Sequence, residues 1–213
     1  IIKYLKMNKI VSVALFLFIW IASCTDPVEV TYDSSSYSFS FGTLPNPDLP
    51  VDNPLTVEGV KLGRMLFYET LLSKDNSQAC ASCHIQKDGF SDLNQFSKGV
   101  EGKFGTRQAM PIFNMAWHNN GFFWDGRAPK LRDQALKPIQ DPLEMNETLE
   151  NVKGKLANSQ KYVDQFKRAF VNGTIDDKNI SFALEQFMFS IVSYQSKYDQ
   201  YKEGKATLTD SEE

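Results

Sequence analysis

The chain has 213 residues, and its 42% hydrophobic and 13% aromatic content is sufficient for the core of one domain with tails. Its 23 basic and 26 acidic residues give a formal net charge of -3, and neither sign forms a long run. These figures exclude a disordered chain and a membrane-embedded bundle, and they predict no nucleic-acid partner.

Residues 1–24 have the features of an export signal. Lys3, Lys6 and Lys9 form a basic region, and the apolar stretch of residues 10–21 is too short to span a bilayer comfortably. The string Ile-Ala-Ser-Cys that ends at Cys24 resembles the bacterial lipobox, in which the signal is cut off before a cysteine that receives lipid. We therefore expect a lipoprotein anchored through Cys24 on the periplasmic side of a bacterial membrane. The alternative is an uncleaved anchor with an incidental cysteine.

Residues 25–53 are rich in Ser, Asp and Pro and show no sustained helical period. This composition predicts a flexible tether between the membrane and a folded domain. The domain is expected to begin at Pro54 and to extend to residue 204.

Three segments carry apolar residues at helical spacing and predict helices with one buried face. They are residues 57–66 after the candidate cap Thr56, residues 162–170 after Ser159, and residues 180–194. Gly63 in the first segment would allow a second helix to approach closely. No alternating strand pattern is present, so the predicted fold is all-α.

Residues 86–128 are rich in Gly and Asn and are long for a connection inside a compact domain. A loop of this length is usually functional or wrapped around a ligand. We therefore expect part of a binding site within it.

The motif Cys80-Ala81-Ser82-Cys83-His84 carries the strongest chemical signal in the chain. Two thiols three residues apart on one helical turn can each form a thioether to a haem vinyl group, and the next residue, His84, can bind the iron. A zinc site would need a second pair of ligands, and a redox CxxC would normally follow a strand. The motif therefore predicts one covalently bound haem c, and the export signal agrees, since c-type haem is attached outside the bacterial cytoplasm.

The sixth coordination position of the iron decides between an electron carrier, which fills it, and a peroxidase, which must open it to substrate. Four side chains could fill it, and a methionine at any one position is more often a core residue than a ligand. The sequence leaves this choice open among Met110, Met115, Met145 and His118.

Several short motifs in a fixed order resemble the bacterial di-haem cytochrome c peroxidases and their MauG relatives. They are LGRMLFY at residues 62–68, CASCH at 80–84, FWDGRA at 123–128, Gln-Ala at 134–135 and PLEM at 142–145. FWDGRA after a CxxCH is much more specific than either motif alone. The resemblance runs from about Pro54 to the end of the chain and implies a cytochrome c-like domain, the peroxide-reacting one of two haem domains.

The resemblance also implies roles for individual residues. His84 would be the proximal iron ligand, and Trp124 would lie between two haems, although a core aromatic is the alternative for this tryptophan. Glu144 would be the distal acid/base that moves a proton during O–O cleavage, and Gln134 a distal amide. Arg107 would lie near the haem, paired with a propionate.

The sequence departs from the family pattern at two places in the long loop. Many members carry a second histidine there that ligates the first haem until activation, whereas ungapped spacing puts Val100 or Glu101 at that position. We therefore expect an open sixth position, with a displaced His118 as the alternative ligand. Members often place Asn after the loop arginine, near an inter-domain calcium. Gln108 stands there, which argues against a calcium site.

The resemblance implies a second haem domain, and residues 205–213 would begin the region that leads to it. The expected activity of the two-domain protein is reduction of hydrogen peroxide to water with electrons from a small cytochrome c or cupredoxin, and a homodimer is expected at full length. One alternative is a MauG-like oxidase of a protein substrate. The other is a mono-haem electron carrier.

Overall fold

The computed structural model describes residues 29–212. The expected export signal and the lipidation site at Cys24 lie outside these residues. Among the described residues, none of the helices combines the length and apolar character that a bilayer-spanning helix needs. From Thr31 onward the chain forms one packed unit.

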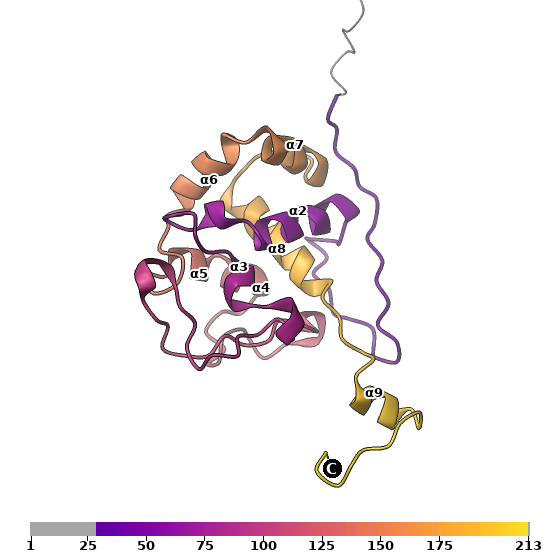
Figure 1. Cartoon of the computed structure of the whole chain (residues 1–213). Coiled ribbons are helices and arrows are strands. Elements are labelled where there is room, and N and C mark those ends of the chain that lie inside the picture. The colour runs from indigo at the N-terminus through magenta and orange to yellow at the C-terminus, as the bar shows by residue number, and fades with distance from the viewer. Residues whose placement is uncertain (1–28, 213) are drawn as a thin grey trace, which may run out of the picture. The chain divides into compact units, whose positions relative to one another are not determined.

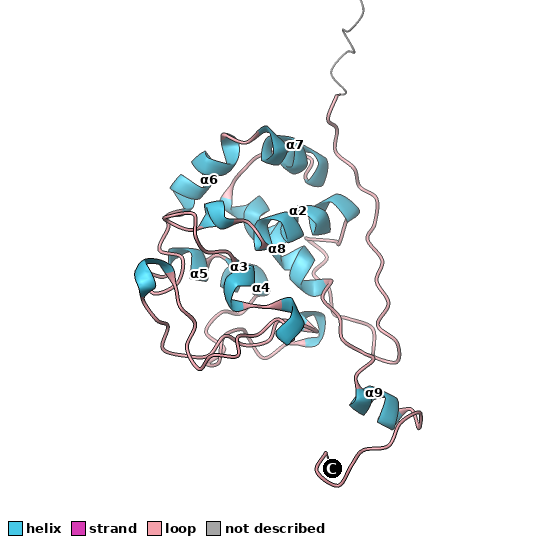
Figure 2. Ribbon diagram, in the orientation of Figure 1, coloured by secondary structure: helices cyan, strands magenta, loops and turns pink. Residues whose placement is uncertain are grey.

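The described residues form helices and loops without a β-strand, apart from isolated bridges (Figure 2). The prediction of a helical, cytochrome c-like domain is thus confirmed at the level of fold class. The helices are α2 (Val57–Phe67), α3 (Cys80–Cys83), α4 (Leu131–Ala135), α5 (Lys137–Gln140), α6 (Leu149–Ala157), α7 (Gln160–Ala169), α8 (Asp177–Phe189) and α9 (Lys197–Lys202).

Helices α2 and α8 cross at the centre of the domain, with α6 and α7 on one side and α3, α4 and α5 on the other (Figure 1). Gly63 lies at the crossing, where an added Cβ would come within 1.9 Å of the carbonyl oxygen of Ala183. Only glycine permits this approach, so its predicted role is confirmed. Thr56 caps α2 as predicted, because its hydroxyl accepts a hydrogen bond from the N–H of Gly59 at 3.0 Å.

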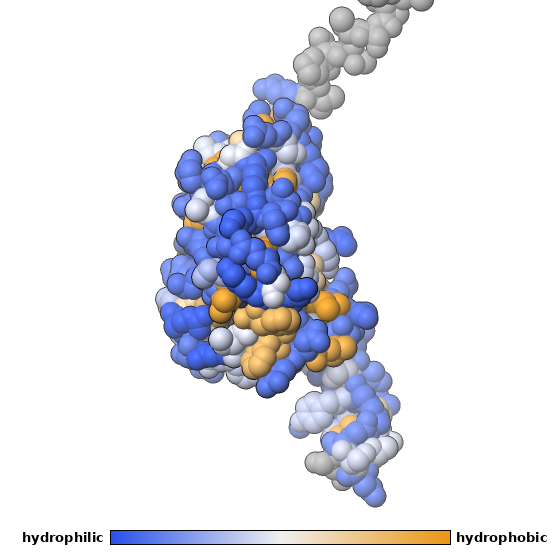
Figure 3. Space-filling view, turned by 60° about the vertical axis from the view of Figure 1, so that its left-hand side comes forward, coloured by the Kyte–Doolittle hydropathy of each residue, from blue (hydrophilic) through white to orange (hydrophobic). Residues whose placement is uncertain are grey.

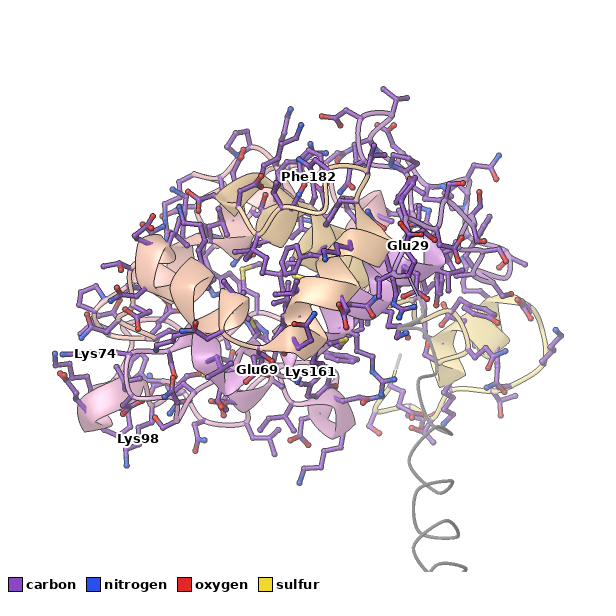
Figure 4. The ribbon with its side chains drawn as sticks, turned by 90° about the horizontal axis from the view of Figure 1, so that it is seen from above. Glu29, Glu69, Lys74, Lys98, Lys161 and Phe182 are labelled. Carbon is purple, nitrogen blue, oxygen red and sulfur yellow. The ribbon has the colours of Figure 1, made fainter. Side chains whose placement is uncertain are left out.

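Burial of apolar side chains from α2, the loops and helices α4 to α8 forms one core. Its most buried members include Leu62, Leu66, Phe67, Leu156, Tyr162, Phe166, Ile180 and Leu184. The Tyr162 hydroxyl donates to Glu69, and Lys161 lies beside the same carboxylate at the surface (Figure 4). Tyr162 and Lys161 thus link α7 to the segment that follows α2.

Helix α8 ends earlier than predicted. The apolar period continues to Tyr194, but the helix stops at Phe189. The backbone beyond it bonds to Asn114 instead: the Asn114 N–H donates to the carbonyl of Ile191 at 2.8 Å, and the Ser193 N–H donates to the Asn114 side chain at 2.8 Å. These long-range bonds replace the next helical turn.

Residues 31–53, part of the expected tether, form an irregular strap along the domain. The Tyr37 N–H donates to the carbonyl of Leu55, and the indole N–H of Trp117 donates to the carbonyl of Pro45 at 2.7 Å. Near its end, Asn53 donates to the buried carboxylate of Glu185 at 2.7 Å. The packed unit therefore begins ahead of the expected boundary at Pro54.

Residues 86–128 form the expected long loop, which contains only single 3-10 turns. Four non-glycine residues in it have positive φ, which marks tight reversals of the backbone. They are Phe90, Glu101, Asn114 and Phe123. The 3-10 turns are Gln86–Asp88, Val100–Gly102 and Met115–Trp117.

Candidate functional site

A cavity of about 590 Å³ lies between α3, α4 and the long loop. Its volume falls within the range of about 300–1,000 Å³ that is usual for cofactor and small-molecule sites. Much of its lining is apolar and includes Phe67, Ile112, Leu131, Leu184 and Met188. The cavity brings together all seven site residues predicted from the sequence: Cys80, Cys83, His84, Arg107, Trp124, Gln134 and Glu144.

The single turn of α3 presents both thiols of the CxxCH motif to this cavity. The Ala79 N–H at its start donates to the Ser82 hydroxyl at 3.0 Å, and the His84 N–H at its end donates to the carbonyl of Cys80 at 3.0 Å. Burial raises the pKa of the Cys80 thiol to about 12 and also raises the pKa of Cys83. The two thiols are free and neutral, side by side on one face of the turn.

His84 follows this turn, and one of its ring nitrogens is already engaged. Nδ1 lies 3.0 Å from the carbonyl oxygen of Phe90, which can only accept, so Nδ1 carries the proton and Nε2 is left as the ligand atom. Burial lowers the pKa of His84 and favours the neutral ring, which is the metal-binding form. Two thiols and this imidazole beside an apolar cavity are a donor set that suits a covalently bound haem.

Glu144 lies on another wall of the same cavity, and burial raises the pKa of its carboxyl to about 7. The nearby carboxylate of Asp141 raises the pKa further, and Arg127 opposes both effects. The backbone of Glu144 is fixed, because its N–H donates to the carbonyl of Asp141 at 3.0 Å and its carbonyl accepts the N–H of Val100 at 2.8 Å. A carboxyl that changes charge near neutral pH is suited to proton transfer.

Gln134 and Trp124 reach the cavity from different elements. Gln134 is on α4 and is half-buried. Trp124 is in the long loop and is 60% exposed, and its indole N–H donates to the carbonyl of Gln108 at 3.0 Å. Trp124 is therefore not the core aromatic that the sequence left as an alternative. Its ring lines the cavity and also reaches the surface.

Arg107 lies at the edge of the cavity with its side chain largely exposed. It forms an ion pair with Asp125 at 2.9 Å, and Arg127 pairs with the same carboxylate at 2.9 Å. Both contacts lower the pKa of Asp125, to about 2, and the contact with Arg127 has the larger effect. The Arg127 guanidinium also stacks over the ring of Phe123 at 3.7 Å. Two cations, Arg107 and Arg127, thus line the cavity.

The four candidates for the sixth ligand all line the cavity. His118 has a partner in this structure, because its Nε2 lies 2.7 Å from the carbonyl oxygen of Gly121. Val100 and Glu101, which occupy the loop position of the second family histidine, do not line the cavity. Val100 is buried, and Glu101 is exposed and paired with Lys74 at 2.7 Å.

The residue after the loop arginine, Gln108, donates its side-chain amide to the carbonyl of Asp92 at 3.0 Å. The Gln108 side chain therefore forms a hydrogen bond inside the long loop. Among residues 29–212, no three His, Cys, Asp or Glu side chains are grouped as a metal site would require.

Sequence reasoning missed three residues that act on Glu144. Asp141 and Arg127 set its electrostatic surroundings. Asp141 directly precedes PLEM and Arg127 lies inside FWDGRA, so both motifs offered an available signal. Gly99 packs against the Glu144 backbone, and nothing in the sequence distinguishes it from the other loop glycines.

Figure 3 shows one face of the molecule, which is mostly hydrophilic, with apolar residues gathered in the lower part of the domain. Four aromatic residues of the long loop are among the large side chains exposed to solvent: Phe96, Phe104, Phe113 and Trp124. Phe113 and Trp124 also line the cavity. The cavity therefore opens near exposed aromatic surface.

Comparison with known proteins gives consistent matches. The family model described as di-haem cytochrome c peroxidase matches residues 57–207. The methylamine utilization protein MauG of Methylophilus methylotrophus is 34% identical over 155 residues, 73% of this chain and 46% of that protein. The cytochrome c551 peroxidase of Nitrosomonas europaea is 33% identical over 160 residues, 75% of this chain and 48% of that protein.

Solved structures agree with the fold. A MauG-like protein associated with microbial copper homeostasis superposes with a TM-score of 0.72 at 29% identity, over 83% of this chain and 53% of that one. The diheme peroxidase of Burkholderia thailandensis superposes with a TM-score of 0.64 at 22% identity, over 74% of this chain and 45% of that one, which supports the fold alone. The chain spans about half the length of the curated relatives it matches.

Proposed function

The chain belongs to the di-haem cytochrome c peroxidase family, and we propose that it provides the peroxide-reacting haem domain of a protein that reduces hydrogen peroxide to water. The observation that carries this proposal is the position of Glu144, a half-buried carboxyl with its pKa raised to about 7, in the same cavity as the CxxCH motif. An electron carrier has no use for a proton-transfer group there.

In this proposal the chain holds one haem c through Cys80 and Cys83, with Nε2 of His84 as the proximal ligand. The haem supplies the iron at which the peroxide oxygen is reduced. A second haem in a further domain and a small cytochrome c or cupredoxin would supply the electrons.

Glu144 would take a proton from one peroxide oxygen and deliver it to the other. The apolar walls and Asp141 keep its pKa near the working pH, where exchange of a proton in either direction costs little. Gln134 would orient the peroxide by a hydrogen bond. Arg107 would pair with a haem propionate in place of Asp125.

Trp124 would assist electron transfer between the two haems. Its support is its position, since the ring both lines the cavity and reaches solvent, where a further domain could contact it. The proposal places the protein outside the cytoplasm, on the periplasmic side of a bacterial membrane and held by lipid on Cys24. It includes a homodimer at full length and does not include calcium.

A second candidate function is oxidation of a protein substrate, as a MauG-like enzyme. The relatives in favour are the MauG proteins at 34% and 32% identity and the MauG-like structure at 29% identity. Peroxide activation by Glu144 is common to both functions, so the final electron donor separates them.

The test uses the haem-loaded, full-length protein and the variant Glu144→Gln. Loss of a positioned acid/base group lowers such rates by about 10²–10⁴-fold, so we expect peroxide reduction with a reduced cytochrome c or cupredoxin to fall by at least about 100-fold at equal haem content. The matched control is Glu147→Gln, three residues away, where the buried glutamate pairs with Lys155 outside the cavity lining. Equal rates for Glu144→Gln and the wild type would remove Glu144 from the reaction. Peroxide-dependent oxidation of a protein, with no turnover of small redox donors, would favour the MauG-like function.

A further inference from the structure

The turn that contains Gly99 is pressed against the backbone of Glu144. A Cβ at position 99 would lie 2.1 Å from the carbonyl oxygen of Leu143 and 2.6 Å from that of Glu144. Both obstacles are backbone atoms, so no side-chain rotation could relieve the clash. Only glycine allows the two segments to approach this closely.

Hydrogen bonds fasten the same contact. The Val100 N–H donates to the carbonyl of Glu144 at 2.8 Å. Within the turn, the Gly99 N–H donates to the carbonyl of Lys103 at 2.8 Å, and the Gly105 N–H donates to that of Ser97 at 3.0 Å. The turn is thus closed by its own hydrogen bonds, and it directs the Val100 N–H at the Glu144 carbonyl.

Lys74 ties a third segment to this pair. Its backbone N–H donates to the carbonyl of Met145 at 2.9 Å, and its ammonium pairs with Glu101 at 2.7 Å. Lys103 pairs with the other oxygen of Glu101 at 2.9 Å. Figure 4 shows Lys74 and Lys98 at the same edge of the domain. The segment that carries Glu144 is therefore held from two sides by elements that are distant in the sequence.

We propose that Gly99 is a positioning residue, which lets the turn of residues 97–103 close on residues 143–145 and so fixes the Glu144 carboxyl in the cavity. The proposal rests on the proposed function, in which Glu144 moves a proton. Displacement of the carboxyl by about 1 Å can cost such a reaction about 100-fold, so an anchor on its backbone bears directly on rate.

Release of this anchor has a second consequence. The charged groups that face Glu144 are Asp141 and Arg127. The neighbouring thiols of Cys80 and Cys83 are neutral, because burial raises the pKa of both, and they can no longer ionise once they become thioethers. Burial is the main cause of the raised pKa of Glu144. If the turn moves away, solvent reaches the carboxyl and its pKa falls toward the ordinary value of 4.5.

The experiment compares Gly99→Ala with Gly154→Ala in the haem-loaded, full-length protein. Gly154 is in α6, and a Cβ added there meets nothing within 4 Å. We expect Gly99→Ala to lower kcat/KM for peroxide by about 10- to 100-fold and to move the acid limb of the pH profile downward. Hydrogen exchange should become faster at the Val100 amide. Gly154→Ala should change none of these quantities.

A second pair of variants applies if Gly99→Ala does not fold. Val100 opens a 3-10 turn, and the preceding Gly99 is extended, so the local backbone accepts proline at position 100. The ring carbon that replaces the N–H would push against the Glu144 carbonyl oxygen, which lies 2.8 Å from the Val100 nitrogen, and so would release the contact. Val100→Pro removes the N–H donated to Glu144, whereas Val100→Ala keeps it and loses similar packing. Only Val100→Pro should shift the pH profile.

The outcomes separate this inference from the proposed function. If Glu144→Gln lowers peroxide reduction while Gly99→Ala and Val100→Pro keep the wild-type pH profile and rate, the positioning role of Gly99 is wrong and the proposed function stands. If Glu144→Gln is fully active, the proposed function is wrong, and the positioning role of Gly99 is wrong with it. A loss of haem content without a shift of the pH profile would show a purely structural role and overturn the inference.

Discussion

The carbonyl oxygen of Phe90 lies 3.0 Å from Nδ1 of His84, six residues earlier in the chain. Phe90 has a positive φ of 56°, and the preceding Gly89 has a φ of 70°, so a tight left-handed reversal brings this carbonyl back to the imidazole. The contact selects the tautomer and leaves Nε2 as the ligand atom. The local backbone, rather than a carboxylate side chain, therefore orients the proposed proximal histidine.

Covalent attachment of haem is the first prediction. Because both thioether positions line the cavity, denatured protein from a strain with haem-attachment machinery should keep its haem stain on a gel. Cys80→Ala combined with Cys83→Ala should abolish the stain. Cys24→Ser removes a thiol outside the motif and should retain it. Extraction of haem from the wild type into acidic organic solvent would contradict covalent attachment.

The second prediction concerns the sixth position of the iron. His118 is engaged by the carbonyl of Gly121, and neither Val100 nor Glu101 lines the cavity, so we expect no strong distal ligand. The oxidised protein should show a high-spin absorption spectrum and bind cyanide without prior reduction. A low-spin spectrum that His118→Ala converts to high-spin would show instead that His118 has replaced the Gly121 contact with an iron bond.

The third prediction is the pH dependence of peroxide reduction. Burial raises the pKa of Glu144 to about 7, so the carboxyl is neutral below that pH and ionised above it. A proton acceptor must be ionised, and activity should therefore fall as the pH drops through about 7. Asp141→Asn removes the second cause of the raised pKa while its amide oxygen can still accept the Leu143 N–H. The acid limb should then move to lower pH.

The control for this variant is Asp133→Asn, which removes the same charge from the exposed face of α4. Its pH profile should match that of the wild type. Steady-state rates between pH 5 and 9 at equal haem content measure both variants. An unchanged acid limb in Asp141→Asn would show that another group controls the profile.

The fourth prediction concerns the buried ion pair between Arg132 and Glu185. Arg132 joins α4 to α8 and to Asp52 of the strap, and Glu185 is almost fully buried. Arg132→Met would leave an uncompensated buried carboxylate, which costs about 3–5 kcal/mol. Arg132→Met combined with Glu185→Met should cost less than Arg132→Met alone, because no charge is then stranded.

Denaturant unfolding of the haem-loaded protein measures these free energies. Lys205→Ala disrupts the exposed pair with Glu203 and should change the unfolding free energy by no more than about 0.5 kcal/mol. A double variant less stable than Arg132→Met would show that the ion pair itself, rather than the stranded charge, stabilises the domain.

The sequence alone predicted the helical fold class, the cap at Thr56 and the close packing at Gly63. Each follows from local chemistry or from the period of apolar residues, which a single segment contains. It also indicated seven site residues through short motifs, and the structure places all seven on one cavity. Their roles as ligand, proton carrier and electron path stay predictions.

Only the tertiary structure decided the features that depend on contacts between distant segments. Helix α8 ends at Phe189 because Asn114 takes the next backbone bonds, and the strap of residues 31–53 packs because its partners lie on the loops and on α8. The raised pKa of Glu144 arises mainly from burial in the folded domain, and Gly99 lies against the backbone of Leu143 and Glu144, which are distant in the sequence. Sequence periodicity reports which face a segment buries, whereas burial of one carboxyl and the approach of two backbones exist only once the chain has folded.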